Sequence, residues 1–231
     1  MGERIRIQTP DGDFSAYVAR PKAEKAPAVI VIQEIFGVNQ VMRDITDWLG
    51  AQGYLAICPD LFWRIEPDID ITDQSEAEWK RAFELFNAFD TDLGVKDIQA
   101  TIKAARADHQ GNGKVGAVGF CLGGKLAYLT ATRTDADAAV SYYGVGIETL
   151  VAEAEKLTRP LLMHIAEEDA FVPKEAQAII QQALKDHPQI EIHTYPGRDH
   201  AFAREGGEHY HEADAKLAGG RTLQFFQRTI G

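Results

Sequence analysis

The sequence predicts a single α/β domain whose mainly parallel sheet has about eight strands and helices on both faces. The first observation is a continuous β-branched run at residues 28–32, which is typical of a strand buried on both faces. The second is that further apolar runs alternate with segments of helical length along most of the chain. The third is composition, because 231 residues with 45% hydrophobic and 26% charged side chains suit one large globular domain.

The chain opens with a predicted hairpin. Residues 4–8 and 14–19 alternate apolar and polar side chains on either side of a Pro-Asp-Gly turn at 10–12, which predicts two antiparallel strands with one solvated face. After the buried strand that follows, Asn39 is expected to cap a helix ending near residue 52. Residues 54–58 then predict a second buried strand.

Residues 61–91 interrupt the alternation of strands and helices. This acidic, partly helical insert is too long for a simple connection. It carries aromatic residues at Trp63, Trp79, Phe83, Phe86 and Phe89. Two interpretations stay open: the rings pack the insert onto the body of the domain, or they line a pocket beneath a cap.

Beyond the insert, strands and helices alternate regularly. We expect strands at 115–120, 138–143, 160–165 and 190–195, and helices at 92–107, 125–132, 147–156, 173–185 and 208–228. Because a helix connects each strand to the next, neighbouring strands should run parallel.

Composition excludes several functions. The chain has 24 basic and 35 acidic residues and a formal net charge of −11, so it should repel nucleic acids and anionic membranes. No segment resembles a signal peptide or a membrane span. Cys58 and Cys121 are the only cysteines, which favours a reduced, cytoplasmic setting, and we expect Cys58 to be buried. His209 and His211 do not share a helix face, which argues against a metal site. We also expect a monomer.

The segment at 114–125, KVGAVGFCLGGK, predicts a strand, a sharp turn and a helix, with Cys121 at the turn. Its GxCxG pattern, with Gly119 and Gly123 flanking the cysteine, is the thiol version of the GxSxG nucleophile elbow. Such a turn places the nucleophile at a helix N-terminus, which favours a thiolate. It also directs the N–H of Leu122 to where an oxyanion would form.

Two other interpretations compete for this segment. A cysteine between glycines is often only a small buried residue at a helix–sheet contact. The stretch from Gly119 to Lys125 also fits GxxxxGK, the start of a phosphate-binding loop, but Leu126 stands where such a loop needs Ser or Thr, which argues against nucleotide binding.

Partners for a nucleophile follow two later strands. Asp169 comes after the strand at 160–165, and His200 lies in the loop after the strand at 190–195. The order Cys121, Asp169, His200 is that of the α/β hydrolases, whose catalytic residues gather at the carboxyl ends of the strands. His200 would stabilise the thiolate and protonate a leaving group, and Asp169 would fix its tautomer. Ile35, in the loop after the strand at 28–32, is the expected second oxyanion donor.

The chain closely resembles the dienelactone hydrolases (carboxymethylenebutenolidases) over nearly its whole length. The matching segments are QEIFGVN at 33–39, CPDL at 58–61, NGKVGAVGFCLGG at 112–124, YYGVG at 142–146 and DHAFAR at 199–204. The resemblance implies cofactor-free opening of an unsaturated lactone that bears a carboxylate, giving maleylacetate. It also implies that Glu34 helps to ionise the thiol, that Arg204 binds the substrate carboxylate, and that Tyr143 contacts the substrate.

The chain departs from the family pattern in the insert. Trp79 falls where the family has a second carboxylate-binding arginine, and Phe83 and Phe86 replace other aromatic residues. Arg81 is two residues away, roughly on the opposite side of a helix. Ala201 is a second departure, since a small hydroxyl residue often follows the histidine. Two alternatives therefore stay open: an esterase or thioesterase for another small carboxylated or aromatic ester, and a non-catalytic thiol redox sensor.

Overall fold

The computed structural model describes residues 2–231 and divides into two compact units, Met1–Ala117 and Val118–Gly231. Its strands form one eight-stranded sheet, within the described residues, in the order β1-β2-β4-β3-β5-β6-β7-β8. Strand β5 (Gly111–Phe120) passes from the first unit into the second. The predicted α/β class and strand number are confirmed, whereas the prediction of a single domain stays a prediction.

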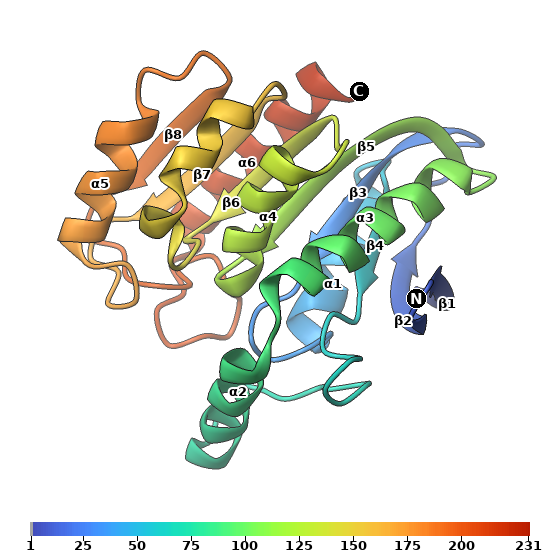
Figure 1. Cartoon of the computed structure of the whole chain (residues 1–231), viewed down its shortest axis with the longest axis horizontal. Coiled ribbons are helices and arrows are strands. Elements are labelled where there is room, and N and C mark those ends of the chain that lie inside the picture. Colours follow the sequence, from blue (N-terminus) through green and yellow to red (C-terminus); the bar gives the residue numbers. More distant parts are fainter. Residues whose placement is uncertain (1) are drawn as a thin grey trace. The chain divides into compact units, whose positions relative to one another are not determined.

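The first unit contains the hairpin and the first buried strands. Strands β1 (Glu3–Thr9) and β2 (Gly12–Ala19) are antiparallel, β2 pairs antiparallel with β4 (Leu55–Pro59), and β3 (Ala26–Ile32) pairs parallel with β4. In Figure 1, helix α1 (Gln40–Ala51) lies behind these strands and α3 (Thr91–Ala107) lies in front of them. Asn39 caps α1 as predicted, because its side chain accepts a hydrogen bond from the N–H of Met42 at 3.2 Å.

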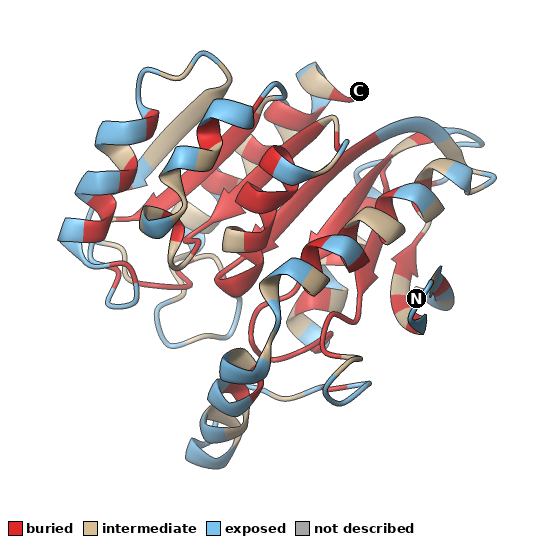
Figure 2. Cartoon of the chain, in the orientation of Figure 1, coloured by how far each residue is buried: buried red, intermediate tan, exposed pale blue. Residues whose placement is uncertain are grey.

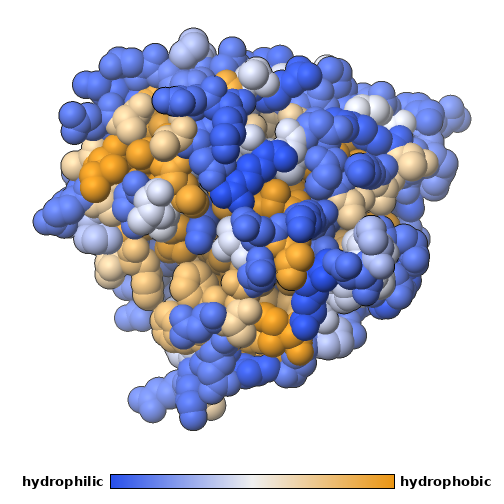
Figure 3. Space-filling model, viewed as in Figure 1, coloured by the Kyte–Doolittle hydropathy of each residue, from blue (hydrophilic) through white to orange (hydrophobic). Residues whose placement is uncertain are grey.

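The insert contributes helix α2 (Glu76–Ala88), which projects from the rest of the first unit in Figure 1. Ser75 caps its start, with the Ser75 hydroxyl accepting from the Glu78 N–H at 3.3 Å. Only Ala82 and Leu85 of this helix are buried, and Figures 2 and 3 show an exposed, hydrophilic outer surface. Helix α2 therefore contacts its unit along a narrow face.

The second unit continues the parallel sheet. It contains α4 (Leu122–Arg133), β6 (Ala138–Tyr142), β7 (Leu161–Ala166), α5 (Lys174–Leu184), β8 (Ile190–Tyr195) and α6 (Glu212–Thr229). Strands β6, β7 and β8 pair in parallel register. In Figure 1, α4 and α5 lie in front of these strands and α6 lies behind them, so the predicted helices on both faces are present.

Three predicted helices differ from the structure in helix type or by more than one residue at a limit. The segment at 147–156 forms two 3₁₀ helices, Ile147–Thr149 and Val151–Lys156, because Leu150 between them leaves helical geometry with φ −119°. The closing helix begins at Glu212 rather than 208, since the His211 side chain accepts from the N–H of Asp214 and ends the preceding loop. Helix α4 begins at Leu122, three residues earlier than predicted.

His164 belongs to a buried polar network between β7 and α6. Its Nδ1 lies 2.8 Å from the Tyr195 hydroxyl, and its Nε2 lies 3.1 Å from the Thr222 hydroxyl. Thr222 in turn lies 2.7 Å from the hydroxyl of Tyr142. Burial, with smaller contributions from His193 and Arg221, lowers the pKa of His164 well below its usual 6.5. The folded protein therefore holds His164 neutral.

This network predicts a loss of stability in acid. Below pH 6.5 the unfolded chain binds a proton at this histidine and the folded protein does not, so His164 makes the free energy of unfolding fall by up to about 1.4 kcal/mol per pH unit. Its full contribution is present above pH 6.5. Urea unfolding between pH 7.5 and 5 should show a steeper decline for the wild type than for His164→Asn, which cannot titrate. Parallel declines would contradict the prediction.

Candidate active site

Cys121 occupies a strained turn between β5 and α4. Its backbone has φ 56° and ψ −115°, a region that residues with side chains rarely adopt. A Cβ on Gly119 would lie 1.9 Å from the carbonyl oxygen of Gly123, so only glycine fits at that position. Gly124, which sequence reasoning did not single out, is equally constrained, since its Cβ would lie 2.4 Å from the Tyr142 oxygen. The turn therefore has the geometry predicted from GxCxG.

The turn places Cys121 immediately before the first residue of α4. The thiol-bearing residue is 8% exposed, and its N–H donates to the carbonyl of Tyr142 at 3.1 Å. Its carbonyl accepts from the N–H groups of Lys125 at 3.2 Å and Val145 at 3.4 Å. Leu122 begins the helix, so its N–H has no acceptor within α4 and can serve a ligand.

Asp169 and His200 meet as predicted, although 31 residues separate them. The Nδ1 of His200 lies 2.9 Å from Oδ2 and 3.0 Å from Oδ1 of Asp169. Asp169 also accepts hydrogen bonds from the N–H groups of Phe171 at 2.8 Å and Val172 at 3.1 Å, which fix the carboxylate in the loop after β7. Both side chains are buried, with 5% and 1% exposure for His200 and Asp169.

The electrostatics of His200 link it to Cys121. Burial alone would lower the pKa of His200, but the charge of Cys121 and the hydrogen bond to Asp169 outweigh this effect and raise it to about 10. The Nε2 atom of His200 is buried and has no nitrogen or oxygen partner among residues 2–231. With Nδ1 bound to Asp169, Nε2 is the ring atom left for the thiol. The three residues therefore come together in one unit of the chain.

Two aromatic rings flank His200. Tyr143, which has a φ of 38°, lies edge-on to it with a centroid distance of 5.1 Å. Phe171 lies edge-on at 4.9 Å and is 48% exposed. Sequence reasoning identified Tyr143 but missed Phe171. The sequence feature that could have identified Phe171 is its position two residues after the predicted acid, Asp169.

Arg204 lies in the turn after His200 and is 7% exposed. Its N–H donates to the carbonyl of Ala201 at 2.9 Å, which closes the turn. Ala201 itself has a φ of 61°, so the backbone is strained directly beside the histidine.

In the first unit, the predicted residues Glu34 and Ile35 lie in the loop after β3. They are 1% and 4% exposed. The next residue, Phe36, packs edge-on against Trp79 of α2 at a centroid distance of 5.1 Å. The insert helix therefore contacts the very loop that carries the two residues.

The aromatic face of α2 is partly packed and partly exposed. Trp79 stacks on Phe83 at 5.6 Å, and its indole N–H donates to the carbonyl of Asp73 at 3.0 Å. Phe83 is 41% exposed, and Phe86 is half-buried one turn further along the same face. Packing of the insert onto the body thus accounts for Trp79, whereas Phe83 retains exposed surface. Arg81 forms ion pairs with two glutamates, Glu66 and Glu84.

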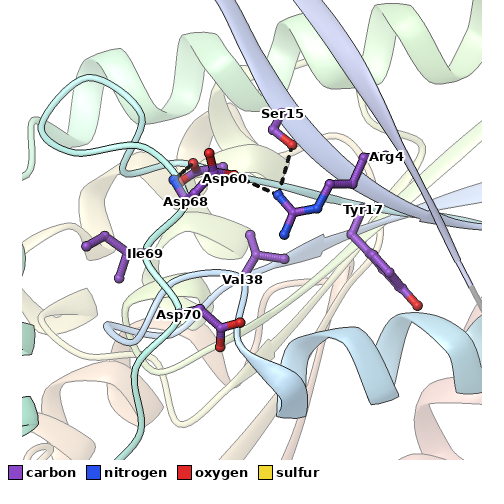
Figure 4. A pocket seen from close by; sticks show the side chains of 8 residues that line it. All are labelled: Arg4, Ser15, Tyr17, Val38, Asp60, Asp68, Ile69 and Asp70. Carbon is purple, nitrogen blue, oxygen red and sulfur yellow. Dashed lines mark hydrogen bonds and ion pairs between the residues drawn. The ribbon is translucent and has the colours of Figure 1, made fainter.

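Other features of the structure give little evidence for a further functional site. Among residues 2–231 no group of three His, Cys, Asp or Glu side chains could hold a metal ion, and no helix is long and apolar enough to cross a membrane. Cys58 is buried, as predicted, and both cysteines are free thiols. Figure 4 shows a small hollow in the first unit, which Arg4 spans to reach Asp68 at 2.7 Å. None of the predicted site residues lines it.

The mainly parallel sheet and the strained elbow are those of an α/β hydrolase. The model of the dienelactone hydrolase family matches residues 14–230, and the chain belongs to this family. It is 52% identical over 228 residues to a protein of Azospirillum brasilense named "Putative carboxymethylenebutenolidase", covering 96% of each chain. It is 42% identical over 226 residues to the carboxymethylenebutenolidase of Pseudomonas putida, covering 97% of this chain and 96% of the other.

A solved structure supports the fold over the same length. The crystal structure titled "Putative Dienelactone Hydrolase", from Klebsiella pneumoniae, superposes with a TM-score of 0.86 at 32% identity and covers 98% of both chains. The family resemblance inferred from the sequence motifs is therefore confirmed.

Proposed function

We propose that this protein hydrolyses the ester bond of an unsaturated lactone bearing a carboxylate, converting dienelactone to maleylacetate through a Cys121, His200, Asp169 triad. The observation that carries the proposal is the strained cysteine at the elbow, whose charge raises the pKa of a histidine already bound to a buried aspartate. A buried packing cysteine needs neither the strained backbone nor the oriented histidine.

The reaction follows from these positions. The Cys121 thiolate attacks the lactone carbonyl carbon, and the carbonyl π electrons move to oxygen to give a tetrahedral oxyanion. Collapse of this intermediate breaks the ring C–O bond, and protonated His200 supplies a proton to the leaving enolate. Water, deprotonated by His200, then hydrolyses the thioester and regenerates the thiol. Asp169 keeps Nδ1 protonated, so Nε2 handles both proton transfers.

The oxyanion would be stabilised by two backbone N–H groups. Leu122 offers one at the start of α4. By resemblance to the family, Ile35 in the loop after β3 supplies the other. One such donor is worth about 3 kcal/mol of transition-state stabilisation.

Glu34 and Arg204 complete the proposed substrate recognition. The family resemblance assigns to Glu34 the ionisation of the thiol when substrate arrives and to Arg204 the capture of the substrate carboxylate. The planar guanidinium can chelate a carboxylate through two N–H groups, so one arginine can suffice. Tyr143, Trp79, Phe83 and Phe86 would supply apolar contacts to the substrate.

Trp79 favours a second candidate, an esterase or thioesterase for less charged substrates. It replaces the family's second arginine, and the neighbouring Arg81 is engaged by Glu66 and Glu84. With one cation fewer and exposed aromatic surface at Phe83, the site would favour aromatic or apolar esters. In either case we propose that the enzyme acts as a cytoplasmic monomer, without a cofactor, on a small molecule rather than nucleic acid or membrane.

The test compares two substrates with a nucleophile-free control. We expect purified protein to consume cis- or trans-dienelactone faster than p-nitrophenyl acetate, measured by ultraviolet absorbance, and Cys121→Ala to abolish both activities.

Glu34→Gln should lower lactone turnover by about 10²-fold without unfolding the protein, because it removes the carboxylate proposed to help ionise the Cys121 thiol. Unchanged turnover would remove Glu34 from the mechanism.

Each alternative has a distinct outcome in this assay. Fast, Cys121-dependent ester hydrolysis with slow lactone loss would favour the esterase or thioesterase over the lactone hydrolase. Rapid alkylation of Cys121 by iodoacetamide without turnover of either substrate would favour the redox sensor and would overturn the hydrolase.

A further inference from the structure

The acid and the base of the proposed triad lie in two separate loops of the second unit. Asp169 lies in the loop after β7 and His200 in the loop after β8. Backbone contacts join the loops, since the N–H of Glu168 donates to the carbonyl of Arg198 at 2.7 Å. The position of His200 relative to Asp169 therefore depends on how firmly these loops are held together.

Asp199 contacts both loops with a single oxygen atom. Its Oδ1 accepts a hydrogen bond from the N–H of His200 at 2.6 Å and another from the N–H of Ala170 at 3.1 Å. Ala170 directly follows the triad acid. Asp169 therefore reaches from the first loop to His200, while Asp199 reaches back from the second loop to the neighbour of Asp169.

The surroundings of Asp199 favour its charged, accepting form. Burial alone would raise the pKa of this carboxyl, but the hydrogen bonds from His200 and Ala170 outweigh burial and hold the pKa below its usual range. Hydrogen bonds to an ionised acceptor are roughly twice as strong as neutral ones. His209 is a more distant partner, with its Nε2 3.8 Å from Oδ2.

The backbone beside His200 also needs support. Ala201 has a φ of 61°, and a non-glycine residue persists in this conformation only where its surroundings enforce it. The hydrogen bond to the N–H of His200 acts on the residue directly before this strained position.

We propose that Asp199 is a positioning residue, whose Oδ1 joins the two loops and sets the separation of Asp169 and His200. This inference rests on the proposed triad. Asp199 acts through backbone N–H groups and takes no part in proton transfer. A misplacement of about 1 Å can lower a rate by about 10²-fold, so losing the two hydrogen bonds of Asp199 should lower turnover.

Three substitutions separate geometry from charge. Asp199→Asn keeps an acceptor oxygen at the same position and removes the charge. Asp199→Glu keeps the charge and moves the oxygen by one methylene group. Asp199→Ala removes both. We expect kcat to fall by about 10- to 100-fold in the Ala and Glu variants with little change in KM, and to stay within about threefold of wild type in the Asn variant.

A second readout does not depend on turnover. The rate at which iodoacetamide alkylates native Cys121 at pH 7 reports its proposed pairing with His200, because the thiolate is the reactive form. Cys58 is fully buried and does not compete. Alkylation should slow several-fold in Asp199→Ala and Asp199→Glu and stay near the wild-type rate in Asp199→Asn, with melting temperatures recorded for all variants.

Asp214→Ala is the matched control. Its carboxylate lies 3.2 Å from Arg198 and 2.9 Å from His211. It does not accept from the N–H of His200 or Ala170, as Asp199 does. We therefore expect kcat and the alkylation rate to stay within about twofold of wild type.

The outcomes are distinct. Wild-type behaviour of Asp199→Ala and Asp199→Glu in both assays would overturn the proposal, and so would an Asn variant as impaired as the Ala variant, since that would assign the effect to charge. If the wild type turned over no substrate, the hydrolase proposal would fail while the alkylation series still decided the role of Asp199.

Discussion

Replacing His200 with alanine is expected to lower kcat/KM for the preferred substrate by about 10³-fold or more. In the proposed mechanism, the variant would lose the partner of the Cys121 thiolate, the acid for the leaving group and the base for thioester hydrolysis. Asp169 would keep its backbone hydrogen bonds, so the loop after β7 should retain its conformation. The measurement is steady-state turnover of lactone and ester, with melting temperature as the check on folding.

The double variant Cys121→Ala/His200→Ala sharpens this test. Residues that act as one catalytic unit are strongly non-additive, so the double variant should be no less active than either single variant. His164 provides the matched control, because it is also buried in the same unit but bonds Tyr195 and Thr222 instead of the proposed triad. His164→Asn should lose stability and keep kcat/KM within about threefold. A fully active His200→Ala variant would remove this histidine from the mechanism.

Asp97→Ala is expected to destabilise the protein by about 3–5 kcal/mol, the cost typical of breaking a buried ion pair from one side. Asp97 lies on α3 and is 1% exposed. Arg64 donates to both of its oxygens at 2.8 and 2.9 Å, and the indole N–H of Trp63 donates to Oδ2 at 2.8 Å. Removing the carboxylate takes away the acceptor of the Trp63 indole and leaves Arg64 only its ion pair with the more exposed Asp11, at 2.9 Å.

The contribution of Asp97 can be separated from that of ordinary surface charge. Arg4 forms a 2.7 Å ion pair with Asp68, but both side chains are more than half exposed. Such exposed pairs contribute less than about 1 kcal/mol, so Arg4→Ala should change stability little. Urea unfolding of both variants makes the comparison. A loss below about 1 kcal/mol for Asp97→Ala would show that the pair with Arg64 does not anchor the insert.

Much of this protein follows from local sequence. Continuous β-branched runs require strands covered on both faces, and β3 is buried nearly throughout. The GxCxG spacing predicted the elbow because glycine is the only residue type that fits at position 119, beside Gly123. The chain order of Cys121, Asp169 and His200 was enough to propose the triad, since successive parallel strands bring their carboxyl ends to one edge. The family motifs added the reaction class.

Contacts between distant segments were decided only by the tertiary structure. Nothing in the local pattern showed that Trp79 would pack against Phe36 or that Asp199 would bond Ala170, because those partners lie far apart in sequence. Helix limits also depended on single side chains, such as His211 capping α6. The sequence by itself determined which residues we propose to carry chemistry, because backbone strain and charge are local requirements. The tertiary structure decided which residues hold them in place, since packing and shared hydrogen bonds form only when separate loops meet.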